Sequence, residues 1–372
     1  MCAVEWKKLG DVVNLSRGVV ISKDYLRDNE GIYPVYSSQT ANDGVLGRIS
    51  TYNYDGEFLT WTTDGANAGT VFHRFGKFSI TNVCGLIKIK DEAIITYRYL
   101  YYWLNLVAKN YVSEGMGNPK LMSNAMGNIV IPLIPITKQQ EIVSHLDTFT
   151  TLISNLESEL DMRRKQYEHY RNQLLDFEGV EKLPLSEVFE MRGGYTPSTK
   201  NEEFWEDGIL PWFRMEDIRE NGNILSDSTL HITPIAVKKN GLFPMNSIIL
   251  ATSATIGVHA LLTVPALSNQ RFTAFYPKEK YEDKVNYKYT YYYFYIIDEW
   301  CKNNTVQGGF ASVDMAGLRK YLFSLPSLTK QQEIVEKLDA FENLIQLLEQ
   351  EIKLRKQQYE YYREKLLTFE KE

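Results

Sequence analysis

Two long stretches of the chain, residues 137–178 and 329–372, carry apolar side chains in alternating steps of four and three. The seam positions are Ile142, Leu146, Phe149, Ile153, Leu156 and Leu160 in the first stretch, and Ile334, Leu338, Phe341, Ile345, Leu348 and Ile352 in the second. This spacing is the a/d pattern of a coiled coil and predicts one long helix in each stretch. At 1.5 Å per residue, each helix is expected to be about 60 Å long.

The two stretches are copies of each other. The segment TKQQEIV at 137–143 recurs unchanged at 329–335, and 25 of 42 ungapped positions match between 137–178 and 329–370. Thr137 with Gln140, and Thr329 with Gln332, fit a capping box and predict that each helix begins there. The chain is therefore interpreted as an internal duplication.

An apolar stripe of this length needs a partner helix. The duplicate in the same chain is the obvious one, and a pseudo-twofold axis relating the halves makes the two helices antiparallel. The seam alone also permits two separate coiled coils, each paired with another protein. Arg163 and Arg355 interrupt the seam at equivalent positions, where they could set the register or mark a place where the helices separate.

The segments before each helix, residues 1–136 and 179–328, predict two mixed α+β domains. Both contain short strand-like runs broken by Gly, Asn, Asp and Ser, followed by one tyrosine-rich run, at 97–104 and 287–294. Core packing of a buried helix explains the tyrosines better than base stacking does. The expected order is domain, helix 137–178, domain, helix 329–372.

Composition is that of a globular protein without a membrane span. Hydrophobic residues make up 44% and charged residues 24% of 372, and no apolar run approaches the 18 residues that a span needs. The first residues, MCAVEWKKLGD, do not fit a secretory signal, so a cytoplasmic location is expected. Three scattered cysteines indicate free thiols, and the five histidines show no metal-ligand spacing, so no metal is assigned.

The net charge of −6 argues at first against a nucleic-acid partner. Its distribution changes that conclusion. Residues 137–178 carry 5 Lys+Arg against 8 Asp+Glu, whereas residues 1–136 carry 13 against 12. The negative excess therefore lies mainly on the helices, and the first domain is slightly basic.

Catalytic motifs are missing from the sequence. No phosphate-binding GxxxxGK[ST] loop, GxSxG elbow or HExxH helix occurs, and the nearest glycine-rich stretch, GMGNPK at 115–120, contains a proline that removes a backbone donor. We assign no catalytic residue. An enzyme with a dispersed site remains an alternative, suggested only by acidic clusters such as Glu202 with Glu206.

Polar loop residues of both domains are candidates for contacting DNA. Arginine suits guanine, Asn and Gln suit adenine, and Ser or Thr suits phosphate. The candidates are Arg17, Lys23, Ser37, Ser38, Gln39, Thr62, Asn67, Arg74 and Lys77 in the first domain, and Arg192, Tyr195, Thr196, Ser198, Trp212, Arg214, Thr252, Ser253, Gln270 and Arg271 in the second.

The whole chain resembles the specificity subunit of type I restriction-modification systems. The resemblance is carried by the repeated TKQQEI, by GGFASVDM at 308–315, and by the GGYTPS and FW pattern between 193 and 212. The first half departs from it, with RGVVISKDY where the second has the GGY pattern. The domains would then be two target-recognition domains, separated by helices that form an antiparallel intramolecular coiled coil.

That resemblance implies a non-catalytic DNA reader. Each domain would recognise half of a bipartite double-stranded target, and a rod of about 60 Å would span roughly 17 or 18 base pairs. Two modification subunits, which use S-adenosylmethionine to methylate adenine, would dock on the helices, and restriction subunits using ATP and Mg²⁺ would join them. This chain itself would need no cofactor. The alternative from a different class is a coiled-coil adaptor whose domains bind proteins.

Overall fold

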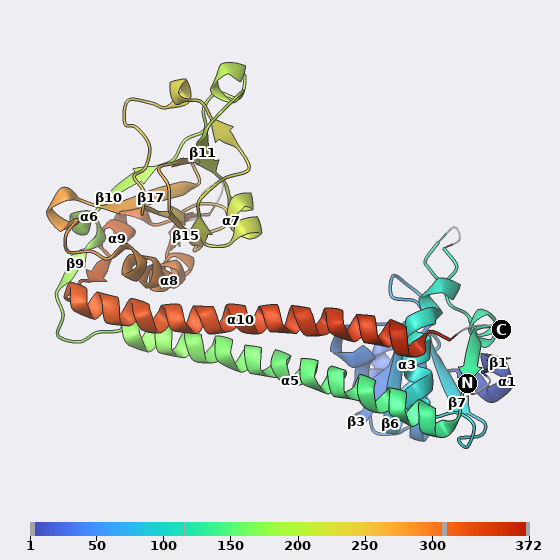
Figure 1. Ribbon diagram of the computed structural model, residues 1–372. Helices are drawn as coiled ribbons and strands as arrows, with labels where there is room; N and C mark the ends of the chain where they lie inside the picture. Colours follow the sequence, from blue (N-terminus) through green and yellow to red (C-terminus); the bar gives the residue numbers. More distant parts are fainter. Residues whose placement is uncertain (1–3, 115–116, 307–310, 370–372) are drawn as a thin grey trace. The chain divides into compact units, whose positions relative to one another are not determined.

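The protein is described by a computed structural model that covers residues 4–114, 117–306 and 311–369. Residues 115–116 of GMGNPK and 308–310 of GGFASVDM lie outside the described residues, as does Cys2. The chain forms two compact units, residues 1–158 with 350–372, and residues 159–349. Each unit contains one mixed domain and parts of both long helices (Figure 1).

The domain of the first unit is built on a six-stranded sheet with the order β2-β7-β5-β6-β3-β4. The strands are β1 (Glu5–Lys8), β2 (Val13–Arg17), β3 (Glu30–Tyr36), β4 (Val45–Ile49), β5 (Tyr54–Thr62), β6 (Val71–Ile80), β7 (Cys84–Ile89) and β8 (Val130–Leu133), and the helices are α1 (Leu9–Val12), α2 (Lys23–Asp28), α3 (Tyr97–Val107) and α4 (Ser123–Gly127). The strands β1 and β8 form a separate antiparallel pair.

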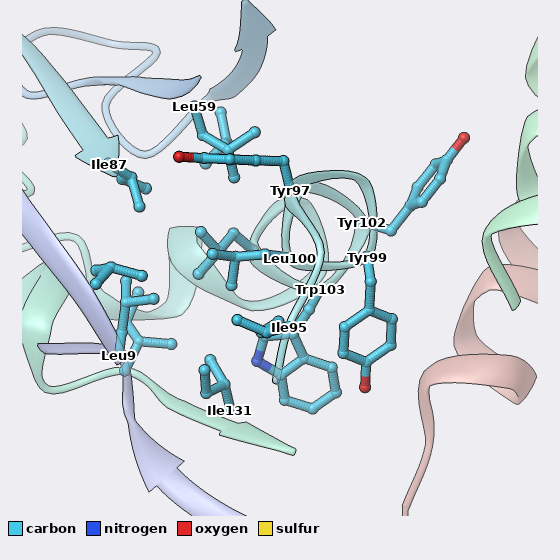
Figure 2. Close-up of a cluster of buried hydrophobic side chains, with 14 of the residues drawn as sticks. Leu9, Leu59, Ile87, Ile95, Tyr97, Tyr99, Leu100, Tyr102, Trp103 and Ile131 are labelled. Atoms are coloured by element: carbon cyan, nitrogen blue, oxygen red, sulfur yellow. The ribbon is translucent and has the colours of Figure 1, made fainter. Parts of the chain in front are cut away.

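The tyrosine-rich helix α3 is the centre of this domain's core. Figure 2 shows Leu100 of α3 pointing toward Leu59 and Ile87 of the sheet, whereas Tyr102 lies on the opposite side of the helix. Thr96 caps α3 by accepting a hydrogen bond from the backbone N–H of Tyr99. The prediction that the tyrosine run packs in a core is confirmed.

The second domain uses the same kind of frame. Its five-stranded sheet has the order β10-β17-β14-β15-β12, and a three-stranded sheet has the order β13-β11-β16. The strands are β9 (Lys182–Pro184), β10 (Phe189–Gly193), β11 (Leu210–Phe213), β12 (Ile224–Leu225), β13 (His231–Ile232), β14 (Ile248–Ala251), β15 (His259–Leu262), β16 (Leu267–Ser268), β17 (Phe272–Pro277), β18 (Thr305–Val306), β19 (Ser312–Val313) and β20 (Leu322–Ser324), with helices α6 (Leu185–Val188), α7 (Met215–Asn221), α8 (Tyr287–Asn303) and α9 (Met315–Lys320). The second tyrosine-rich run is α8, and it is also buried.

Both predicted free thiols that lie within the described residues are buried. Burial raises the pKa of Cys84 and of Cys301 to about 12. The thiols therefore stay protonated at neutral pH and act as small apolar side chains.

The long helices are α5 (Ile136–Leu175) and α10 (Leu328–Leu367). Each begins one residue before the predicted start, so Thr137 and Thr329 lie inside the first turn and the predicted capping box is wrong. The carbonyl of Pro135 accepts the backbone N–H of Gln139, and that of Ser327 accepts the N–H of Gln331. The preceding loop residue is therefore the one that starts each helix.

Within each unit the two long helices run antiparallel. In the first unit, Ile142 near the start of α5 and Leu367 at the end of α10 belong to one core. In the second unit, Leu175 at the end of α5 and Ile334 near the start of α10 belong to another. All twelve predicted seam residues are buried or half-buried, so the intramolecular pairing is confirmed and coiled coils with other proteins are not needed to explain the seam.

The same contacts between α5 and α10 occur in both units, with the roles of the two helices exchanged. In the first unit Lys356 pairs with Glu157 at 2.6 Å, and in the second unit the equivalent Arg164 pairs with Glu349 at 2.6 Å. The rings of Phe149 and Tyr362 stack at 5.4 Å in the first unit. Their equivalents in the second unit, Phe341 and Tyr170, stack at 5.5 Å. Such exchange is the mark of a twofold interface formed here by duplicated sequence.

The two seam arginines are held along their own helices. Arg163 donates to Gln166 at 2.9 Å and pairs with Glu159 at 3.3 Å. Arg355 donates to Gln358 at 2.8 Å and pairs with Glu351 at 2.8 Å. These i,i+3 and i,i−4 partners satisfy both guanidinium groups locally.

A buried glutamine joins each domain to its helix. The side-chain amide of Gln139 donates to the carbonyls of Ile94 and Ile134 at 2.8 and 2.9 Å, and its oxygen accepts the N–H of Thr96 at 3.0 Å. Both Gln139 and Gln331 are completely buried.

Gln331 repeats these three bonds in the second unit. It donates to the carbonyls of Lys284 and Pro326 at 2.9 and 2.8 Å, and it accepts the N–H of Asn286 at 2.7 Å. This role explains why the first glutamine of TKQQEIV occurs in both copies.

An acidic residue eight positions further on, about two helical turns, forms a second joint. Asp147 of α5 accepts hydrogen bonds from Arg98 and Tyr102 of α3. In the second unit Asp339 accepts from Lys288 and Tyr292 of α8, at 2.7 and 2.6 Å.

The second unit adds a half-buried carboxylate to this joint. Glu342 accepts from the hydroxyls of Tyr167 and Tyr292 at 2.8 and 3.1 Å. Burial raises the pKa of Glu342 above its ordinary value, against the lowering effect of these hydrogen bonds.

We expect Gln139→Ala to lower the free energy of unfolding by roughly 3 kcal/mol, because it leaves two carbonyls and one N–H without partners in a buried place. The matched control is Gln140→Ala, since Gln140 is the exposed neighbour and its loss should change stability by less than about 0.5 kcal/mol. Urea unfolding of the two variants measures this difference. Equal effects of both substitutions would contradict the assigned role of Gln139.

The raised pKa of Glu342 predicts a pH dependence of stability. A group whose pKa is raised on folding adds stability that is fully present below its unfolded value of 4.5 and is lost as the pH rises through the folded value. The melting temperature of the wild type, relative to Glu342→Gln, should therefore fall as the pH rises above 4.5. Thermal unfolding across that range, with Glu360→Gln as an exposed control for loss of one charge, checks the sign.

Candidate nucleic-acid interface

Five loops of the first domain converge at one corner of its sheet. Arg17, at the end of β2, donates to the hydroxyl of Thr63 at 3.2 Å and to the carbonyl of Asn82. Residues Asp64 and Lys120 face each other in an isolated β-bridge. These bonds connect the segments after β2 and β5 with the segment before β7 and the one that precedes α4.

The loop after β3 joins the same corner. The hydroxyl of Ser38 donates to the carbonyl of Val83, and Asn67 donates to the hydroxyl of Thr40 at 3.0 Å. Thr62 is buried, and its hydroxyl donates to the carbonyl of Asn67. The structure thus gathers most of the predicted first-domain residues in one region: Arg17, Ser37, Ser38, Gln39, Thr62 and Asn67.

Three predicted residues have other surroundings. Lys23 is exposed at the first position of α2. Arg74 is only 3% exposed, its guanidinium lies over the ring of Tyr36 at 3.7 Å, and it pairs with Asp43 of the turn that follows β3. Lys77 is exposed and lies over the ring of Tyr52 at 4.7 Å. Arg74 is therefore a structural residue of the domain, and the prediction that it contacts DNA has no support from its burial.

In the second domain, the predicted residues meet around the loop that follows β10. Thr196 donates to the side-chain oxygen of Gln270 at 2.6 Å. The indole N–H of Trp212 donates to the carbonyl of Tyr195 at 2.9 Å, and that of Trp205 donates to the carbonyl of Ser198 at 3.1 Å. Arg271 is exposed next to Gln270.

The remaining predicted residues of this domain lie around that loop or beneath it. Thr252 is 9% exposed, and its carbonyl accepts a hydrogen bond from the backbone N–H of Val313. Arg192 lies over the ring of Phe243 at 4.6 Å and donates to the carbonyl of Asn240. Ser253 is half-buried. Arg192 and Thr252 therefore position the loops more than they present groups to a ligand.

A hollow of about 790 Å³ lies beside this loop cluster. Its lining residues are Thr199, Glu202, Trp205, Glu206, Trp212, Arg214 and Leu230. The two indole rings meet edge to face at 4.9 Å. Because both indole N–H groups already donate to backbone carbonyls, the rings offer faces and edges to the hollow.

The strand register relates a few positions of one domain to positions of the other. Gly85 of β7 lies between Arg17 and Trp61, and Thr273 of β17 lies between Gly193 and Leu250. By the same register Asp64 corresponds to Ser253, and Lys120 corresponds to Ser312, which also form an isolated bridge. The two domains therefore share a corner whose side chains differ.

Asp64 and Lys120 were missed by reasoning from the sequence. Lys120 follows Pro119 in a glycine-rich segment, and that context indicates a turn. Its position near Arg17 depends on ion pairs of Asp64 with both cations, which lie far apart in the sequence, and no local pattern reveals such contacts. The only signal in the sequence was that Arg17 and Lys120, two cations, occur in predicted loops of a slightly basic domain.

The described residues show neither a metal site nor a membrane helix. Within residues 4–114, 117–306 and 311–369, no group of three or more His, Cys, Asp or Glu side chains could hold a metal ion. No helix in that part of the chain is long and apolar enough to cross a bilayer.

Comparison with protein families gives a match over most of the chain. The family described as the type I restriction modification DNA specificity domain matches residues 3–162 and 178–355. The specificity subunit of the Escherichia coli type I restriction enzyme EcoprrI is 50% identical over 214 residues, which cover 55% of this chain and 53% of that subunit. The chain therefore aligns with about half the length of this relative.

Other relatives align over nearly their whole length. The specificity subunit of the type I restriction enzymes EcoR124I and EcoR124II of Escherichia coli is 38% identical, with 99% of this chain and 95% of that subunit covered. A type I specificity subunit of Mycoplasma pneumoniae is 31% identical, with 97% of each chain covered.

Solved structures share the fold at low sequence identity. A specificity subunit from M. genitalium superimposes with a TM-score of 0.59 and 15% identity, covering 100% of this chain and 97% of that chain. A chain from a type I restriction-modification system gives a TM-score of 0.65 and 16% identity, covering 98% of this chain and 97% of that chain.

The burial of Arg74 predicts a loss of stability on substitution. Arg74→Ala should lower the free energy of unfolding by about 2 to 3 kcal/mol, because it removes a packed guanidinium and its hydrogen bonds to Asp43 and Thr60. Lys77→Ala, at an exposed site, should leave stability unchanged within error. Urea unfolding compares the two. If Arg74→Ala weakens binding to duplex DNA without lowering stability, the structural role is wrong.

Proposed function

Because this chain belongs to the type I restriction-modification DNA specificity family, and its role is to supply DNA sequence specificity, we propose that it reads a bipartite double-stranded target with one domain for each half. The subunits of this family are non-catalytic. The second loop cluster and the first differ in their side chains, which suits two unlike half-sites separated by unspecified base pairs.

The observation that carries this proposal is the exchange of contacts between the duplicated helices. The pair of Lys356 with Glu157 and the pair of Arg164 with Glu349 are equivalent, as are the two ring stacks. A duplication that preserves the helix contacts keeps the same helix pairing in both units. Because the loop residues have changed, the two domains can recognise different DNA sequences.

We propose that the same duplication provides two docking places for modification subunits. In the first unit Leu152 and Leu354 are 38% and 59% exposed, and in the second unit their equivalents Leu344 and Met162 are 37% and 63% exposed. Exposed apolar side chains at repeated positions fit two copies of one partner. A hollow of about 730 Å³ along α5, lined by Val143 and Leu152 among others, supports docking in the first unit.

The chemistry belongs to the partners in this proposal. Modification subunits would bind S-adenosylmethionine and methylate adenine in the cytoplasm, and restriction subunits would use ATP and Mg²⁺. The family assignment favours this function over a coiled-coil adaptor that binds proteins, and over an enzyme with a dispersed site among acidic residues such as Glu202 and Glu206.

Deletion of the gene should abolish adenine methylation at one bipartite motif of the host. Long-read sequencing of the deleted strain, and of the strain complemented with the wild-type chain, measures this. Exchange of residues 1–136 for the matching domain of a relative should change one half of the motif and leave the other half unchanged. A methylation map that is identical with and without the gene would overturn the proposal.

A further inference from the structure

The corner shared by the two domains holds a charged cluster in the first domain. Asp64 lies 3.7 Å from the guanidinium of Arg17 and 3.8 Å from the ammonium of Lys120. It also accepts the hydroxyl of Thr63 at 2.7 Å. The second domain has Gly193, Ser253 and Ser312 at the positions of the three charged residues, so the cluster is a property of the first domain.

Arg17 is held firmly in this cluster. One terminal nitrogen of its guanidinium donates to Thr63 and to the carbonyl of Asn82, and the other lies 3.9 Å from the sulfur of Met122. Its Nε is buried and has no hydrogen-bond partner among the described residues. The nitrogen beside Met122 has only this weak sulfur acceptor, and the Arg17 side chain is 32% exposed, so this nitrogen is the donor that an acceptor arriving from outside can reach.

Exposed apolar side chains lie next to the cluster: Met122 touches Arg17, and the carbonyl of Val19 accepts the N–H of Asn82, whose own carbonyl accepts from Arg17. Val19 and Val20, two and three residues after Arg17, are 61% and 77% exposed, and Met122 is 41% exposed. A site for phosphate would be expected to gather further cations and to exclude carboxylates. A carboxylate between two cations, beside exposed valines, instead matches the edge of base pairs, where acceptors, amino groups and the thymine methyl lie next to one another.

We propose that Arg17 and Lys120, both paired with Asp64, read a guanine in the half-site of the first domain, while Val19 and Val20 contact the neighbouring base pair. The acceptors are O6 and N7 of guanine in the major groove, which pair with Arg or Lys more often than any other base edge does. This proposal rests on the proposed function. It adds which residues of the first domain read its half-site, and which base they require.

The test uses the host strain that lacks the gene, complemented with the full-length chain as wild type, Arg17→Ala, Lys120→Ala or Lys88→Ala. Lys120 is 54% exposed on its side chain, so its substitution should not disturb folding even if that of Arg17 does. Lys88 is an exposed lysine near the other end of β7 and controls for loss of one positive charge. Long-read sequencing then gives the methylated motif of each strain.

The half-site of the first domain is the one that changes when residues 1–136 are exchanged. We expect the wild-type and Lys88→Ala strains to require guanine at one position of this half-site. In the Arg17→Ala and Lys120→Ala strains, methylation at sites with another base there should rise about tenfold or more relative to guanine sites, because one base contact contributes about 1 to 3 kcal/mol of discrimination. The other half-site should be unchanged in all four strains.

Several results would overturn the inference. One is a first half-site that contains no required guanine, and another is a Lys120→Ala strain that keeps the requirement unchanged. A third is uniform weakening across sequences, with the slope of binding against salt reduced by about one in the purified complex, which identifies a phosphate contact. Absence of methylation in the wild-type strain is a different result, because it contradicts the proposed function itself.

Discussion

The arrangement of each domain on its helix depends on one buried amide. At the turn from domain to helix, two carbonyls and one N–H would otherwise be buried without partners. Gln139 and Gln331 satisfy all three with one side chain. Glutamate has no donor for the carbonyls, and asparagine is one methylene shorter, so the geometry selects glutamine. A helix is stiff, and fixing this joint therefore fixes how the domain is oriented on the helical segment of its own unit.

The pairing of a helix with its own duplicate places a second constraint on the sequence. Each seam residue of one helix packs against the seam of the other helix. A substitution in one copy therefore alters the surroundings of residues in the other copy. The stacks of Phe149 on Tyr362 and of Phe341 on Tyr170 illustrate this coupling. Mutual packing explains why 25 of 42 positions stay identical in the helices, while the domains, whose surfaces do not face each other's copies within a unit, have diverged.

Sequence periodicity was sufficient for the helices and their seam because an apolar stripe is a local property. The helix starts were displaced by one residue, because the carbonyl of Pro135 or Ser327 accepts the first intrahelical hydrogen bond. The sheet order could not be predicted, because parallel pairing of β3 with β6 joins Val35 to Ser79 across many residues. Loop polarity selected residues that the structure largely gathers in one region of each domain, but it could not separate Arg74, buried over Tyr36, from exposed neighbours.

The corner shared by the two domains shows how the side chains presented there can change while the fold is kept. The backbone there is fixed by the same elements in both: a strand ending at Arg17 or Gly193, and a bridge between Asp64 and Lys120 or between Ser253 and Ser312. None of these side chains belongs to a hydrophobic core. Because such partly exposed positions contribute little to stability, substitutions there change the presented donors and acceptors at small cost to folding. The glutamine joints and the helix seam lie elsewhere in the chain, so the side chains of this corner are free to vary without disturbing them.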